Sequence, residues 1–208
     1  MIAIVDYGVG NLRSVENMLR KVGAECAISS DPDVIKHADK LILPGVGNFG
    51  QGMKKLRSKG LLDVLNWFAL DVKRPVLGIC LGAQILGNGS EEAEGPGLGW
   101  IDMQCKRFPY DLNVPVPHMS WNELKIVNES PLFPDNAVGA RYYFVHSFYM
   151  ECSNSKNIVA NSHHGIDFTA VVQSNNIFGT QFHPEKSHRF GMDVLRAFDG
   201  LKGNYEEV

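Results

Sequence analysis

The stretch "VLGICLGAQILG" at residues 76–87 places one cysteine between two glycines, after an apolar run and before a helix-like run. Its spacing, Gly78-Ile79-Cys80-Leu81-Gly82, is that of G-x-S-x-G, in which a nucleophile sits on a sharp turn between a strand and a helix. The backbone is pressed so closely on both sides of such a turn that a Cβ atom would collide, and glycine removes the collision. The stretch therefore predicts a buried strand that ends at a nucleophilic cysteine.

A helix that begins at Leu81 would favour the reactive form of the Cys80 thiol. The N-terminal amides and the dipole of a helix stabilise a negative charge, and the thiolate is the nucleophilic form of cysteine. The alternative is a buried cysteine at a strand end with no chemical role. The pattern taken alone leaves both interpretations open.

The first hundred residues repeat a short β-branched run, a glycine turn and a longer amphipathic stretch. Strands are expected at 2–7, 40–47 and 75–80, and helices at 12–23 and 53–65. The nearly continuous apolar character of 75–80 indicates burial on both faces of a sheet. This alternation predicts a parallel sheet wound with helices.

The second half has short alternating runs separated by polar or glycine turns, which is typical of hairpins. These runs lie at 100–108, 140–150, 156–162, 168–174 and 177–183, and a last helix follows at about 190–200. The predicted fold is therefore α/β, with a mostly parallel central sheet flanked by helices and an antiparallel hairpin extension. We expect one domain over residues 1–208.

Composition excludes several classes of protein. The net charge of the 208 residues is −3, and no basic cluster indicates nucleic-acid binding. The apolar runs are too short to span a bilayer, and the N-terminus lacks the basic region of a signal peptide. Cys26, Cys80, Cys105 and Cys152 lie far apart, with no C-x-x-C pair, so neither a metal site nor a disulfide framework is expected. The chain is predicted to be cytoplasmic and to need no cofactor.

A base for the cysteine is offered by "QFHPEKS" at 181–187. The residue before a proline favours extended geometry, and alternate side chains of an extended chain share a face. His183 and Glu185 should therefore project together, so that the carboxylate orients the imidazole and the imidazole meets the thiol of Cys80. A surface histidine without a catalytic role is the alternative when this tripeptide is considered alone.

A third element is "LPGVGNFG" at 43–50, where two glycines bracket a valine after a strand. Outward-facing amides of such a loop suit the negative oxygen of a tetrahedral intermediate. The candidate oxyanion donors are the backbone N–H groups of Val46 or Gly47, together with that of Leu81. A simple strand-to-helix turn would carry the same residues.

The motifs P-G-V-G, G-I-C-L-G-x-Q and H-P-E, in this order, resemble those of the class I (triad-type) glutamine amidotransferase family, over essentially the whole chain. The resemblance implies a flavodoxin-like fold and hydrolysis of the glutamine side-chain amide through a thioester on Cys80. His183 would move the protons, and Glu185 would orient it. The resemblance further implies substrate contacts from these residues: Gly47, Gln84, Glu92, His146 and Ser147.

Further stretches, including "DYGVGNLRSV" at 6–15 and "VPHMSWN" at 116–122, are similar to a branch of the family that pairs with a synthase subunit as a heterodimer. This implies a partner surface near these residues: Asn11, Trp121, Tyr143 and Lys186. Ala83 and Ser120 depart from the usual pattern of that branch, where methionine and glycine are common. From the residues alone, Trp121 is by default a core aromatic and His146 a packed histidine.

The acceptor of the ammonia stays open at this point. A synthase of histidine biosynthesis is one possibility, and a sugar-aminating synthase of surface polysaccharide biosynthesis is another. A stand-alone γ-glutamyl cysteine hydrolase would have the same triad and no partner. A binding module with an unused triad would tolerate loss of the Cys80 thiol.

Overall fold

Five parallel strands form the centre of the computed structural model, which describes residues 1–133 and 139–202. They lie in the order β2 (Cys26–Ser29), β1 (Ile2–Val5), β3 (Lys40–Gly45), β4 (Val76–Cys80) and β13 (Ile177–Thr180). Every residue of β1, β4 and β13 is buried. The parallel sheet and the two-sided burial predicted for the strand before Cys80 are confirmed.

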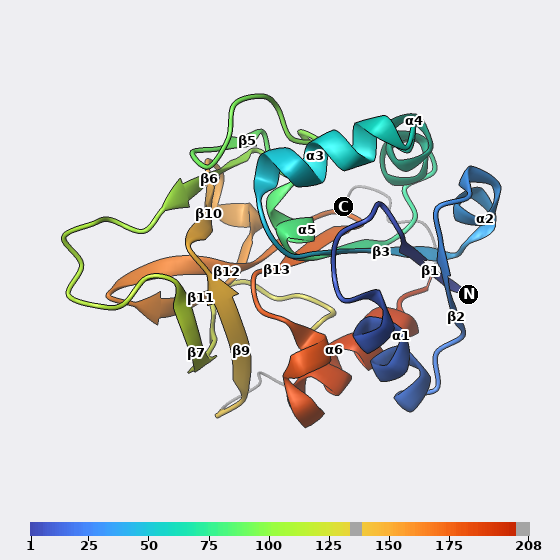
Figure 1. Ribbon diagram of the computed structural model, residues 1–208. Coiled ribbons are helices and arrows are strands. Elements are labelled where there is room, and N and C mark those ends of the chain that lie inside the picture. Colours follow the sequence, from blue (N-terminus) through green and yellow to red (C-terminus); the bar gives the residue numbers. More distant parts are fainter. Residues whose placement is uncertain (134–138, 203–208) are drawn as a thin grey trace.

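Helices cover both faces of this sheet (Figure 1). On one face lie α3 (Phe49–Ser58), α4 (Leu62–Asn66) and the π-helical turn η1 (Trp67–Asp71). On the other lie α1 (Leu12–Lys21) and α6 (His188–Gly200), while α2 (Pro32–His37) packs near the edge. Side chains of β1 alternate between the two cores, as those of a strand must: Ala3 and Val5 join the first, Ile2 and Ile4 the second.

The second half extends the sheet with antiparallel strands. From β13 the order continues through β12 (Ile166–Ser174), β10 (Phe148–Cys152), β6 (Met103–Arg107) and β5 (Gly89–Ser90). β11 (Ile158–His164) pairs with β12 and with β8 (Lys125–Ile126), and the short 3-10 turn η2 (Ser155–Asn157) precedes it. A separate two-stranded sheet is made of β7 (His118–Glu123) and β9 (Arg141–His146), seen at the lower left of Figure 1.

Several predicted boundaries were wrong. The run at 140–150 is not one strand, because the chain bends at Ser147 and passes from the β7–β9 sheet into the main sheet. The helix expected at 53–65 is two helices, since Gly60 adopts a φ of +65° between them. β13 pairs antiparallel with β12, as a hairpin would, but also parallel with β4, which makes it part of the central sheet.

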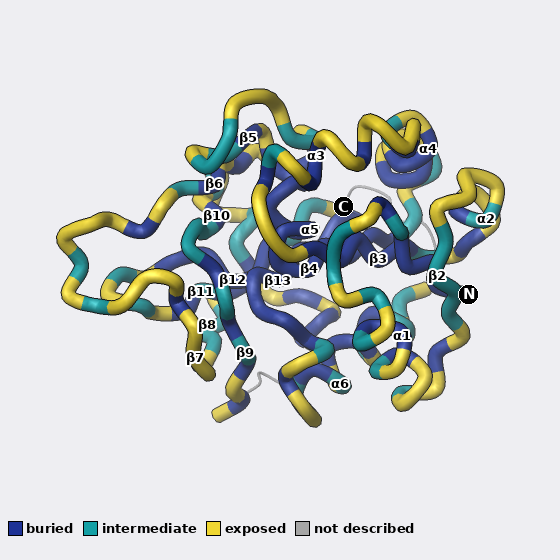
Figure 2. The backbone as a smooth tube through the Cα atoms, in the orientation of Figure 1, coloured by how far each residue is buried: buried dark blue, intermediate teal, exposed yellow. Residues whose placement is uncertain are grey.

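Figure 2 shows buried residues along the central strands and exposed residues on the outer sides of the helices. Among the described residues, no helix is long and apolar enough to cross a bilayer. The carboxyl ends of β3, β4 and β13 lie side by side, because Gly45 pairs with Cys80 and Thr180 with Ile79. The segments that follow these strands therefore meet at one edge of the sheet.

Candidate active site

Cys80 stands on the strained turn that its flanking glycines predicted. β4 ends at Cys80 with φ +54° and ψ −111°, and α5 (Leu81–Gln84) begins at the next residue. A non-glycine residue held there costs about 1–3 kcal/mol and persists only where its surroundings impose it. A Cβ on Gly78 would lie 2.6 Å from the carbonyl oxygen of Gly82, and one on Gly82 would collide with that of Leu43. The close approach of β4, α5 and β3 thus requires both glycines.

The helix after Cys80 is shorter than the sequence indicated. α5 has only 4 residues, and the chain leaves the helical path after Ile85. A helix of this length has little dipole, so the expected contribution of a long helix at Cys80 is reduced to the N–H groups of its first turn. Cys80 is 7% exposed, so its sulfur is nearly buried but not sealed in the core.

His183 and Glu185 form a buried pair beside this thiol. Nδ1 of His183 lies 2.8 Å from Oε1 of Glu185, and their side chains are 1% and 3% exposed. The expected pairing is present, but not by the expected backbone, because only His183 is extended and η3 (Pro184–Lys186) is a 3-10 turn. The turn, rather than a straight strand, brings the carboxylate back to the ring.

The second ring nitrogen of His183 is free for chemistry. Its Nε2 is buried and makes no hydrogen bond with the described residues. Burial lowers the pKa of His183, but the negative charges of a Cys80 thiolate and of the Glu185 carboxylate raise it more, to about 10. The imidazolium form is therefore favoured while these two groups lie next to it.

Ser187 fixes the position of His183 and was not singled out from the sequence. Its hydroxyl donates to the carbonyl of His183 at 2.6 Å and accepts the N–H of Tyr143 at 3.0 Å. The N–H of His183 donates to the carbonyl of Tyr143 at 2.9 Å. The base is thus held to β9 by two connections. No local sequence signal marks a serine for this role.

One cavity of about 410 Å³ joins the predicted groups. Cys80 and His183 line it, and so do Val46, Gly47 and Leu81, whose N–H groups were the predicted oxyanion donors. Gly47 has a φ of +97°, which favours glycine. The predicted glutamine contacts that line the same cavity are Gly47, Gln84, Glu92, His146 and Ser147. Segments more than a hundred residues apart in the sequence therefore share one pocket.

Glu92 and Gln84 have fixed partners in this cavity. One oxygen of Glu92 accepts the N–H of Phe49 at 2.7 Å, at the start of α3. Nε2 of Gln84 donates to the carbonyl of Phe148 at 2.9 Å and to Oε1 of Gln181 at 3.1 Å. Gln181 in turn donates to Sγ of Cys80 at 3.8 Å, a contact that the sequence did not predict.

Three of the predicted partner-surface residues lie together. Trp121 and Tyr143 are in contact, with ring centroids 5.8 Å apart, and Nζ of Lys186 lies 5.6 Å from the Tyr143 ring. Trp121 is 37% exposed and stacks on His188, so it is not the core aromatic that its residue type suggests. Asn11 is elsewhere, at the start of α1, where its side chain accepts the N–H of Ser14.

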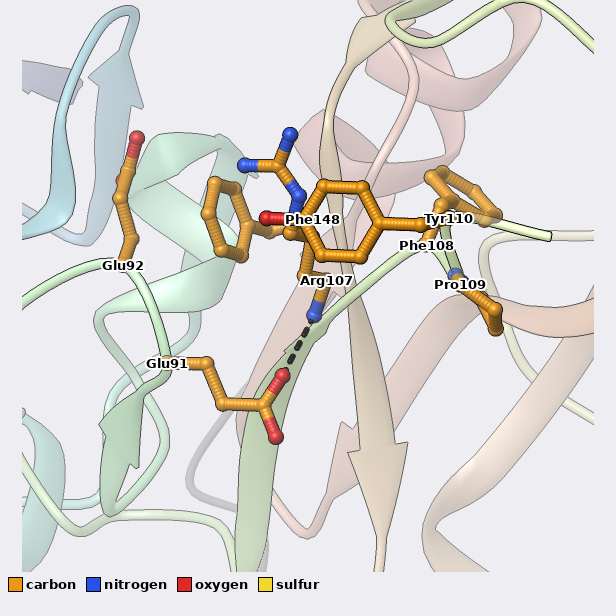
Figure 3. Close-up of a pocket in the computed structure, with 7 residues that line it drawn as sticks. All are labelled: Glu91, Glu92, Arg107, Phe108, Pro109, Tyr110 and Phe148. Atoms are coloured by element: carbon orange, nitrogen blue, oxygen red, sulfur yellow. Dashed lines mark hydrogen bonds between the residues drawn. The ribbon is translucent and has the colours of Figure 1, made fainter. Parts of the chain in front are cut away.

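A second hollow, of about 540 Å³, adjoins the first, because Glu92 and Phe148 line both. Figure 3 shows its walls, with Arg107 close to the rings of Tyr110 and Phe148. The guanidinium carbon is 4.5 Å from the Tyr110 centroid and 5.8 Å from that of Phe148. A positive charge therefore stands near the outer part of the site.

A cysteine on a strained turn that shares a pocket with a buried His–Glu pair is the arrangement of an enzyme with a cysteine nucleophile. Residues 3–199 match the Glutamine amidotransferase class-I family, and the chain belongs to it.

Within this family, the chain is similar to subunits of one named synthase. The chain is 48% identical over 198 residues to "Imidazole glycerol phosphate synthase subunit HisH 2" of Pseudomonas aeruginosa, which covers 95% of this chain and 98% of that protein. It is 49% identical over 199 residues to subunit HisH of Methanothermobacter thermautotrophicus, which covers 95% and 97%. The structure of PurLQS from Thermotoga maritima superposes with a TM-score of 0.73 at 21% identity, over 95% of this chain and 96% of that one. This likeness confirms the predicted fold class.

Proposed function

We propose that the chain is the glutaminase subunit of an imidazole glycerol phosphate synthase. It hydrolyses the side-chain amide of glutamine and passes the ammonia to a cyclase partner in histidine biosynthesis. The observation that carries the chemistry is the meeting of Cys80 and the His183–Glu185 pair in one cavity. The similarity to HisH subunits over 95% of the chain supports the choice of acceptor.

The reaction follows from the positions of these groups. The thiolate of Cys80 attacks the side-chain carbonyl carbon of glutamine, and the proton of the thiol passes to Nε2 of His183. The N–H of Leu81, with that of Val46 or Gly47, stabilises the negative oxygen of the tetrahedral intermediate. When the C–N bond breaks, His183 returns the proton to the leaving nitrogen, and ammonia departs.

The same groups then release glutamate. His183 takes a proton from a water molecule, whose oxygen attacks the thioester carbonyl. Collapse of the second intermediate breaks the C–S bond and returns the proton to the sulfur. Glu185 holds one tautomer of His183 and stabilises its protonated form throughout, as the orienting acid of a triad does.

A partner is part of the proposal. A chain that only released ammonia would waste glutamine, so a second protein that consumes the ammonia is expected. The heterodimer interface would lie at Asn11, Trp121, Tyr143 and Lys186, with an ammonia channel leading from Cys80 into the partner. The four cysteines are free thiols, which fits a reducing compartment such as the cytoplasm.

The test is Cys80→Ala in the complex that co-purifies with the chain. Synthesis from glutamine should disappear, while synthesis from added ammonia should persist, because only the sulfur chemistry is removed. Cys152→Ala is the matched control, since that half-buried thiol does not line the cavity and should leave both activities intact.

Three outcomes would contradict the proposal. Loss of both activities in Cys80→Ala, with an intact complex, would mean that the thiol does more than release ammonia. A co-purifying partner that aminates a sugar instead of forming imidazole glycerol phosphate would keep the glutaminase chemistry and change the pathway. Full glutamine hydrolysis by the isolated chain, unaffected by any partner, would indicate the stand-alone hydrolase.

A further inference from the structure

Two buried histidines behind the pocket form a hydrogen-bond chain with one possible direction. Nδ1 of His146 lies 2.8 Å from the carbonyl oxygen of Phe148, which can only accept, so this nitrogen carries the proton. At the other end, Nδ2 of Asn122 donates to the carbonyl of His163 at 2.8 Å, which identifies it as the amide nitrogen. Both ends of the chain are therefore fixed by backbone carbonyls.

The proton position on His118 follows from the two fixed ends of this hydrogen-bond chain. Nδ2 of Asn122 also lies 2.9 Å from Nε2 of His118, so that ring nitrogen must accept. Nδ1 of His118 then carries the proton and donates to Nε2 of His146 at 3.0 Å. Both rings are neutral, in agreement with burial, which lowers the pKa of His118 to about 4 and that of His146 to about 3.

The chain ends on an atom that shapes the substrate pocket. The carbonyl of Phe148 also accepts Nε2 of Gln84, whose second hydrogen goes to Gln181. With its NH2 group engaged in this way, Gln84, which lines the cavity, has only its side-chain oxygen left to accept a substrate N–H. The direction of the histidine chain thus agrees with an acceptor at Gln84.

His118 links this wall to an outer surface. It lies on β7 and pairs across the small sheet with His146 of β9. Its neighbours on β7, Met119 and Trp121, are 61% and 37% exposed. A shift of β7 along β9 would move His118 relative to His146, and through it the bend at Ser147, where the chain lines the cavity.

We propose that His118 is a positioning residue that acts as a one-way donor to His146, and thereby sets the affinity of the pocket for glutamine. The inference rests on the proposed glutaminase function for its kinetic part. It goes beyond that function by assigning a role to a residue that does not line the cavity.

If His118 mattered only for packing, His118→Asn would be more harmful than His118→Phe. If its hydrogen bond to His146 matters, His118→Phe would be the more harmful variant. The ring stacks on Phe144 and His164, with centroids 5.0 and 4.2 Å away. His118→Phe keeps a ring of this size and removes the donor. His118→Asn removes the ring but can place its amide nitrogen where Nδ1 stands, and so keeps the donor.

The kinetic experiment uses the full chain with its co-purifying synthase partner. His118→Phe should raise KM for glutamine about tenfold, with a smaller change in kcat, because the buried Nε2 of His146 loses the N–H group that donates to it. His118→Asn should stay within about twofold of the wild-type KM if the donor is what matters. His164→Phe is the control. His164 stacks on His118, but its Nε2 hydrogen-bonds the carbonyl of Pro115 and takes no part in the hydrogen bonds between Asn122, His118 and His146.

A second readout does not depend on catalysis. Nitrogen-15 NMR of the imidazoles should find the proton of His146 on Nδ1 in the wild type and in His118→Asn. In His118→Phe the proton should stay on Nδ1, because the Phe148 carbonyl still accepts it, while the nitrogen-15 shift of Nε2 should move toward that of a ring nitrogen that accepts no hydrogen bond. A wild-type proton on Nε2 would overturn the inference, as would an unchanged KM in His118→Phe or greater damage in His118→Asn. If the wild-type complex hydrolysed no glutamine, the proposed function would fail, and the NMR result would still decide the direction of the chain.

Discussion

Replacing Gly78 with alanine tests whether close backbone approach is what builds the cysteine turn. The new Cβ would lie 2.6 Å from the carbonyl oxygen of Gly82 and 2.7 Å from both N and Cα of Ala83. All three are backbone atoms of α5, so no flexible side chain can yield. Ordinary van der Waals contact begins at 3.4 Å, so α5 would have to move away from β4 until these distances grow from 2.6 and 2.7 Å to that value.

The loss of stability in Gly78→Ala follows from the burial of β4 and α5. β4 is buried along its whole length, and it is held by β3 on one side and β13 on the other. Overpacking of a tight core costs about 1–3 kcal/mol, and a clash between two backbones falls at the upper end. We expect the free energy of unfolding to fall by about 3 kcal/mol, a large share of the roughly 5–15 kcal/mol that domains possess.

The same shift should damage catalysis. Withdrawal of α5 moves the N–H of Leu81 and the side chain of Gln84, both of which line the cavity. A misplacement of about 1 Å costs on the order of a hundredfold in rate. We therefore expect kcat/KM for glutamine to fall by about ten- to a hundredfold.

Urea unfolding followed by tryptophan fluorescence measures the stability, and glutamate release measures the activity. The denaturation midpoint of Gly78→Ala should fall without a change in slope. Gly200→Ala is the matched control, because a Cβ there meets nothing within 4 Å. A Gly78→Ala protein within about 0.5 kcal/mol of wild type, with normal activity, would refute the reasoning.

The other predictions concern the base and the partner surface. Glu185→Gln should lower kcat less than Cys80→Ala does, because His183 keeps a hydrogen-bond partner and loses only the charge behind it. Equal inactivity of the two variants would mean that the carboxylate does more than orient the ring. The raised pKa of His183 implies that its interactions stabilise the fold fully below about 6.5, its ordinary value, and are lost as the pH rises through about 10. Urea midpoints of the wild type should therefore fall across this range more steeply than those of Glu185→Gln, and parallel curves would contradict the assignment. Trp121→Ala should weaken binding of the synthase partner in calorimetry by about tenfold or more, as loss of a half-exposed aromatic anchor does. Its melting temperature should stay near that of the wild type, and unchanged affinity would remove Trp121 from the interface.

The sequence predicted those parts of the site that depend on local backbone geometry. Glycines flanking Cys80 indicated the turn because only close packing requires them on both sides, and the structure has that packing. The pairing of His183 with Glu185 was predicted from an extended backbone, whereas a 3-10 turn produces it. Side chains two residues apart were close enough in either geometry for the prediction to succeed.

The features that the sequence did not reveal depend on contacts between distant segments. The bend at Ser147 contains neither glycine nor proline, and the alternating pattern continues through it, so periodicity gave no sign of a change of sheet. The chain from Asn122 through His118 to His146 joins two strands whose pairing appears only in three dimensions. His118 and His146 give the same sequence pattern whether they are packed, exposed or linked by a hydrogen bond.

The place of β13 in the sheet has a consequence for the growing polypeptide. Cys80 ends β4 and His183 follows the neighbouring strand β13, yet β13 is made about a hundred residues after β4. Until β13 is inserted, β4 is an open sheet edge made of apolar residues, which invites pairing with other chains. A nascent protein on the ribosome therefore carries a sulfur without its base, and gains the power to consume glutamine only with its last strand.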